Sequence, residues 1–164
     1  MRTRVVGKDV KVRAISGTHT VLLAFDATRR GRTGLLGFAI KRRDEAEDQE
    51  YWLSATKVFR SVVPQPRPGA SYSTLTHPIQ SFLWGDYSAK PGRRYVYTIR
   101  PLYGEPRNID AGRDVRVTVT TELEEDGGHG IWFNRGAIAS RAYAFKFDNA
   151  APSDPDDPTD TQTK

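Results

Sequence analysis

The three histidines are the first residues to consider for chemistry, because histidine serves both as a metal ligand and as a general base. They stand at His19, His77 and His129, no two of them at metal-ligand spacing, and no H-E-x-x-H motif is present. His19 begins an expected strand and His77 precedes Pro78, so we expect both to be surface or turn residues. The sequence predicts no metal site.

The acidic and glycine-rich stretches do not assemble a catalytic site either. The run DEAEDQE, residues 44–50, lacks the glycine and alternating spacing of a calcium loop, so we interpret it as a solvated hairpin tip. The stretch EEDGGHG, residues 124–130, is not followed by the Lys-Ser/Thr pair of a phosphate-binding loop. No serine stands in a G-x-S-x-G elbow. We therefore predict that this chain is not an enzyme and uses no cofactor.

The segment HGIWFNRGAIASRAYAF, residues 129–145, differs from everything before it. Its second half has a helical apolar stripe at Ile138, Ala142 and Phe145. A helix of about ten residues is too short to persist alone in water, so we expect it to dock, either on the end of its own core or on a partner. The candidate binding residues are His129, Ile131, Trp132, Phe133, Asn134, Arg135, Ile138 and Phe145.

These residues need a body to position them, and short stretches of alternating apolar and polar residues predict one made of strands. In HTVLLAFDA, for example, Val21, Leu23 and Phe25 fall on one face, with Leu22 and Ala24 on the other. Seven strands separated by turn signals are the layout of a β-sandwich. They begin at Val10 and continue through HTVLLAFDA, LLGFAIKRR, YWLSATKVF, SFLWGDYSA, RRYVYTIRPLYG and DVRVTVTTE, the last with Val115, Val117 and Val119 on one face.

Composition sets the expected boundaries. Pro64, Pro66 and Pro68 remove three backbone donors, which predicts a loop or edge between the fourth and fifth strands. The end, APSDPDDPTDTQTK, has no large apolar side chain and is expected to be disordered. The predicted organisation is a flexible N-terminus (1–7), a sandwich (8–122), a glycine/aromatic segment with a short docking helix (123–147) and an acidic tail (148–164).

One stretch carries a family resemblance. SAKPGRRYVYTIRPLYG resembles the corner between the fifth and sixth strands of fibronectin type III domains, with Pro91, Tyr95 and Ile99 at the family's spacing and Ala89 in place of its leucine. The resemblance implies that the Tyr95 hydroxyl bonds a backbone group upstream, the tyrosine corner. The expected fold is therefore all-β: a seven-stranded immunoglobulin/fibronectin type III-like sandwich with a short C-terminal helix.

A second resemblance concerns function. HPIQSFLWGDYSAKPGRRYVYTIRPLYG and HGIWFNRGAIASRAYAFKF are similar to the region ahead of the catalytic domain in a group of bacterial phospholipase D-like proteins. The resemblance implies that His129, Trp132, Asn134 and Arg135 lie near the junction with a phosphodiesterase domain. The H-x-K motif of that enzyme is missing, since the residues two after each histidine are Val21, Ile79 and Ile131.

Charge completes the functional hypotheses. Residues 1–43 hold eleven Lys and Arg against two Asp, within a chain of net charge +5. We rank first a non-catalytic accessory module for a phospholipase D-like catalytic domain, in cis or in trans. A self-associating structural protein, that is a homo-oligomer, comes second. Binding of nucleic acid or an anionic membrane surface by the basic N-terminal third comes third. The lack of a signal peptide, a transmembrane segment and cysteine leads us to expect a cytoplasmic protein.

Overall fold

The computed structural model describes residues 1–55, 57–126 and 128–130. The chain divides into two compact units, of which the first covers Met1–Pro66 and Ser71–Trp132. The second combines Arg67–Ala70 with Phe133–Lys164, and only its residues 67–70 are described, where the Ala70 N–H donates to the Arg67 carbonyl at 3.1 Å. The fold below is that of the first unit.

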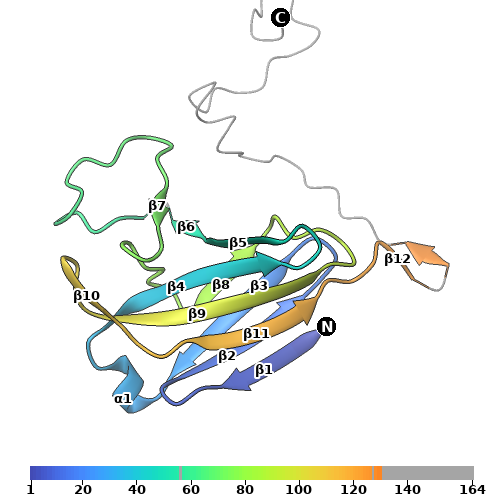
Figure 1. The fold of residues 1–164 in the computed structure, drawn as a ribbon, viewed down its shortest axis with the longest axis horizontal. Coiled ribbons are helices and arrows are strands. Elements are labelled where there is room, and N and C mark those ends of the chain that lie inside the picture. Colours follow the sequence, from blue (N-terminus) through green and yellow to red (C-terminus); the bar gives the residue numbers. More distant parts are fainter. Residues whose placement is uncertain (56, 127, 131–164) are drawn as a thin grey trace, which may run out of the picture. The chain divides into compact units, whose positions relative to one another are not determined.

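Two antiparallel sheets make up most of this unit (Figure 1). In the first sheet the strand order is β1 (Arg2–Val6), β2 (Val10–Ser16), β3 (Val21–Ala27) and β8 (Leu83–Asp86). In the second it is β10 (Asn108–Ala111), β9 (Arg94–Glu105), β4 (Leu35–Asp44) and β5 (Gln49–Trp52), and β11 (Val115–Thr120) also pairs with β9. Within the described residues the fold is therefore all-β, with one short helix, α1 (Arg29–Arg32).

Two small hairpins accompany the sheets. Strand β6 (Ser54–Ala55) pairs with β7 (Tyr72–Ser73), and β12 (Glu125–Asp126) pairs with β13 (His129–Gly130). The long proline-containing segment between β6 and β7 holds no other described strand, as its three prolines predict. No helix among the described residues combines the length and the apolar character needed to cross a bilayer.

The inner faces of the two sheets share one hydrophobic core, because every second residue of their strands points inward. The expected face of β3 is confirmed: Val21, Leu23 and Phe25 are buried, while Leu22 and Ala24 are only partly so. Strand β11 follows the same rule at its three valines. The largest fully buried side chains of the core are Tyr95, Tyr97, Phe38, Leu23, Ile40, Ile99 and Leu102.

The N-terminus differs from its expectation. Residues 1–7 are assigned by sequence to a flexible end, but Arg2–Val6 form strand β1, which pairs with β2 over its whole length. The physical reason is the alternation within RTRVV, which turns Thr3 and Val5 toward the interior and lets Val5 pack against the core. This edge strand proves central to the candidate site.

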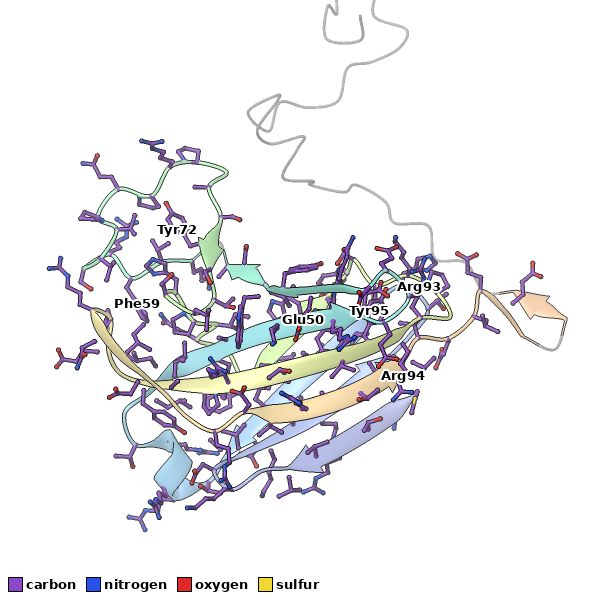
Figure 2. The ribbon with its side chains drawn as sticks, viewed as in Figure 1. Glu50, Phe59, Tyr72, Arg93, Arg94 and Tyr95 are labelled. Carbon is purple, nitrogen blue, oxygen red and sulfur yellow. The ribbon has the colours of Figure 1, made fainter. Side chains whose placement is uncertain are left out.

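The contact predicted for Tyr95 is confirmed. Tyr95 lies at the start of β9, beside Arg93 and Arg94 (Figure 2), with its ring buried in the core. The Lys90 N–H donates to the Tyr95 hydroxyl at 2.9 Å. The hydroxyl therefore satisfies a backbone donor in the turn that leads into β9, as in a tyrosine corner.

Tyr95→Phe is expected to lower the free energy of unfolding by about 1–3 kcal/mol, because it leaves the partly buried Lys90 N–H without its partner. Urea denaturation monitored by circular dichroism measures the change. Tyr103→Phe is the matched control on the same strand, since no hydrogen bond of the Tyr103 hydroxyl is found among the described residues. Equal losses in the two variants would contradict a specific role for the Tyr95 hydroxyl.

Candidate polyanion-binding face

Four cations gather on the outer face of the first sheet. The register of β1 and β2 places Arg4 directly opposite Arg13. Arg2 lies two residues before Arg4, and Lys11 two residues before Arg13, so all four side chains leave the same side of the sheet. We call Arg2, Arg4, Lys11 and Arg13 the basic face.

Most of the basic face lacks acidic partners. Lys11 lies 3.9 Å from Asp26, which also binds Arg32 at 3.1 Å. Arg2, Arg4 and Arg13 are exposed and make no ion pair or side-chain hydrogen bond within the part of the chain that the structure describes. Like charges directly opposite each other across a strand pair are destabilising. A bound anion between Arg4 and Arg13 would offset that repulsion.

A shallow depression lies within the basic face. Its volume is about 210 Å³, and Arg4, Lys11 and Arg13 line it together with Ala24 and Asp26. One water molecule takes up roughly 30 Å³ of liquid, so the depression has room for a phosphate group. The three cations of its lining outnumber the single carboxylate, and that carboxylate already binds Lys11 and Arg32.

The outer face of the second sheet shows the opposite arrangement. Most of its cations, half-buried or exposed, pair with acids: Lys41 with Glu50 at 2.6 Å, Arg100 with Asp114 at 2.7 Å, Arg43 with Asp48 at 3.5 Å and Arg94 with Glu45 at 3.3 Å. The hydrogen bond from Arg100 is the main cause that lowers the pKa of the Asp114 carboxyl. Arg116 makes no ion pair among the described residues, yet its charge contributes to that lowering. The positive charges of this face are therefore mostly neutralised by carboxylates of the same chain.

The single tryptophan of that face is also occupied. The Trp52 ring has Lys41 Nζ at 5.6 Å and the Arg100 guanidinium at 4.8 Å from its centroid. Such cation–π contacts cover the ring that a stacked base or sugar would need. The second sheet therefore offers a poorer site for an anionic ligand than the basic face.

A buried polar cluster joins the two sheets and does not qualify as a ligand site. Arg42 on β4 is 8% exposed and Asp86 at the end of β8 is 3% exposed. Arg42 Nη1 donates to Asp86 Oδ2 at 2.8 Å, and the Tyr97 hydroxyl donates to the same oxygen at 2.8 Å. The Ser88 N–H and hydroxyl donate to Asp86 Oδ1 at 2.9 and 2.7 Å. The second guanidinium nitrogen of Arg42 donates to the Tyr51 hydroxyl.

The pKa shifts in this cluster follow from its hydrogen bonds. Burial alone would raise the pKa of Asp86, but the hydrogen bonds from Ser88 and Arg42 outweigh it and hold that pKa below its ordinary value. Burial alone would lower the pKa of Arg42, but the hydrogen bond to Asp86 and the charge of that carboxylate outweigh burial and raise it above its ordinary value. Burial and the neighbouring carboxylate together raise the pKa of Tyr97. The cluster thus keeps a charged pair inside the protein, where it joins β4, β8 and β9.

His77 lies in a turn as expected, and the structure adds that its side chain is buried. The side chain is only 4% exposed, because the rings of Phe59 and Tyr72 pack against it. Its Nδ1 accepts the Phe59 N–H at 3.3 Å, and burial lowers its pKa. The described residues contain no group of three or more His, Asp or Glu placed to hold a metal ion.

Of the eight residues that the sequence predicts for binding, only His129 is among the residues that the structure describes. His129 lies in β13, paired with Asp126 of β12. The other predicted site residues, Ile131, Trp132, Phe133, Asn134, Arg135, Ile138 and Phe145, lie outside the described residues, as do the docking helix and the acidic tail. The basic face, in contrast, belongs to the third-ranked hypothesis. Sequence reasoning missed its placement, although the alternation Arg2, Arg4 against Thr3, Val5 was the available signal.

Comparison with known proteins assigns this chain to no family. No protein-family model matches it. No curated protein matches it either. The proposals below therefore depend on the geometry of the described residues.

Proposed function

We propose that this chain is a non-catalytic binding module whose basic face holds the phosphate backbone of a nucleic acid strand. The observation that carries the proposal is the contrast between the two sheets: the outward cations of the second are mostly ion-paired, whereas Arg2, Arg4 and Arg13 on the first have no ion pair within the described residues. Unpaired cations that neutralise phosphates release counterions, which drives association.

The shape of the basic face favours a strand over a membrane plane. Its four cations lie on two neighbouring β-strands, which are about 5 Å apart, and successive outward residues along each strand are about 7 Å apart. This is a narrow strip, suited to a linear row of phosphates. Amphipathic binding to a membrane surface would instead require a broad apolar face beside the cations.

We further propose that the two sheets form a fibronectin type III-like sandwich. The supporting observations are the strand orders β2–β3–β8 and β11–β9–β4–β5 and the hydrogen bond from Lys90 to Tyr95. Such an architecture hosts many functions and does not by itself favour nucleic acid. Association with a phospholipase D-like catalytic domain stays a prediction, because most of the segment expected to mediate it lies outside the described residues. Self-association, expected through that segment or through an edge strand, also stays a prediction.

Charge reversal on the basic face tests the proposed function. The double variant Arg4→Glu/Arg13→Glu is expected to weaken binding of a fluorescein-labelled single-stranded 20-mer by at least about tenfold at low salt. The wild-type slope of log K against log salt should be about −3, from roughly 0.7 for each of four phosphate contacts, and should shrink by at least about 1.4 in the variant. Fluorescence anisotropy across a salt series measures both quantities.

The matched control changes the net charge equally at another place. Arg43→Glu/Arg94→Glu alters two exposed arginines that already have acidic partners on the second sheet. It should keep most of the affinity. Equal losses in both double variants would show that overall charge alone governs binding and would overturn the site. Binding to phosphatidylserine vesicles without binding to the 20-mer would replace nucleic acid by a lipid surface.

A further inference from the structure

A second cavity, which shares no lining residue with the depression of the basic face, lies beside β8, the last strand of the first sheet. Its volume is about 590 Å³, within the range of small-molecule sites. Ile79, Leu83 and Trp84 form an apolar wall, and Ser54, Lys57 and Gln80 contribute polar side chains. We propose that this cavity binds a small amphipathic anion, an aryl or alkyl carboxylate, with its apolar body on Trp84 and its carboxylate at Lys57.

The wall that carries Ile79 is fixed by backbone contacts. The Phe38 N–H donates to the Ile79 carbonyl at 3.0 Å, and the Ile79 N–H donates to the Phe38 carbonyl at 2.9 Å. Gly37, with φ of +148°, permits this approach, because a Cβ there would lie 2.5 Å from the Ile79 carbonyl oxygen. The segment is therefore held against β4 before any ligand arrives.

The opposite wall is held in the same way. Strand β6 pairs with β7, and the residue before β6, Leu53, donates its N–H to the Ile40 carbonyl at 2.8 Å. The Leu53 carbonyl in turn accepts the Thr74 N–H at 3.1 Å. Both walls thus belong to hydrogen-bonded backbone, and a preformed cavity loses little free energy to ordering when it binds a ligand.

The lining determines the charge of the ligand. None of the residues that line the cavity is acidic, and Lys57 makes no ion pair within the described residues. The side chains of Ser54 and Gln80 also make no hydrogen bond there, so they remain available as donors. One cation, two polar donors and an apolar wall with an indole are complementary to a carboxylate on an apolar ring.

The test compares a carboxylate with its neutral isostere. In a chemical-shift titration of the full chain, 1-naphthaleneacetate should bind with a Kd of about 1 mM or below, as expected for a ligand of its size. It should bind about fivefold more tightly than 1-naphthaleneacetamide, the upper end for an exposed ion pair. The shifts should fall on Ile79, Leu83 and the Trp84 indole.

Two variants test whether Lys57 and Ser54 determine the preference for the carboxylate over the amide. Lys57→Met should abolish the fivefold preference while leaving the amide affinity unchanged, and Ser54→Asp, at an exposed position, should reverse it. Lys8→Met, an exposed lysine far along the chain, should change nothing. The proposal is overturned if the cavity residues show no shifts at millimolar ligand, or if the preference survives in Lys57→Met. Neither result bears on the basic face.

Discussion

Asp86→Ala is expected to lower the free energy of unfolding by about 3–5 kcal/mol, the largest loss from any single polar substitution in the described residues. The substitution removes the only ionic partner that the buried Arg42 guanidinium has among the described residues. It also removes the acceptor for the Tyr97 hydroxyl and for both donors of Ser88. An uncompensated buried charge carries a cost of this size, against a total stability of about 5–15 kcal/mol for an ordinary domain.

Urea denaturation followed by circular dichroism measures this loss. The matched control is Asp26→Ala, because Asp26 also pairs with cations but its side chain is 56% exposed. Its loss should stay below about 1 kcal/mol, as for surface ion pairs. Arg42→Met in the Asp86→Ala background should recover part of the stability, since it removes the orphaned charge. A double variant less stable than Asp86→Ala would contradict the charge argument.

The sequence predicted the all-β fold because the alternation of apolar and polar residues reports directly on burial. The apolar positions of β3 and β11 point inward as expected, and the acidic run at residues 44–50 covers the end of β4, the turn at 45–48 and the start of β5. Asp44, the last residue of β4, is buried because it lies on the inward face of that strand, and its carboxylate accepts the Ala46 N–H at 3.0 Å. The local sequence pattern therefore predicted strands and a turn in this region, but it did not predict that the Asp44 carboxylate is buried.

The buried ion pair of Arg42 and Asp86 was even less predictable from local sequence. On β4, Phe38 and Ile40 point inward, and the next inward position is Arg42. Arginine is rarely buried unless it is paired. Its partner Asp86 lies 44 residues further along the chain, on the other sheet. No local pattern links two positions that only the packing of two sheets brings together.

The sequence could predict that the candidate site is basic, but it could not predict which cations form it. The excess of Lys and Arg in residues 1–43 suggested an anionic partner, but the count includes Arg42, which is buried. Which cations remain unpaired depends on strand register, since Arg4 meets Arg13 whereas Lys11 meets Asp26. Register is set by pairing across the sheet and by burial of one face.

Leu23→Ala is expected to lower the free energy of unfolding by about 2–5 kcal/mol, because it opens a cavity in a close-packed core. Leu23 is fully buried on β3, whereas its neighbour Leu22 is partly exposed on the outer face of the same strand. Leu22→Ala is therefore the matched control, with the same atoms removed one residue away.

The comparison of these two leucines tests the register of β3, which pairs the Lys11 position of the basic face with Asp26. A shift of β3 by one residue would exchange the two leucines between core and surface. Because β3 pairs with β2, it would also alter the position of Asp26 relative to Lys11. Thermal or urea denaturation should give a Leu22→Ala loss below about half that of Leu23→Ala. Equal or reversed losses would contradict the register of β3 and with it the pairing of Asp26 with Lys11.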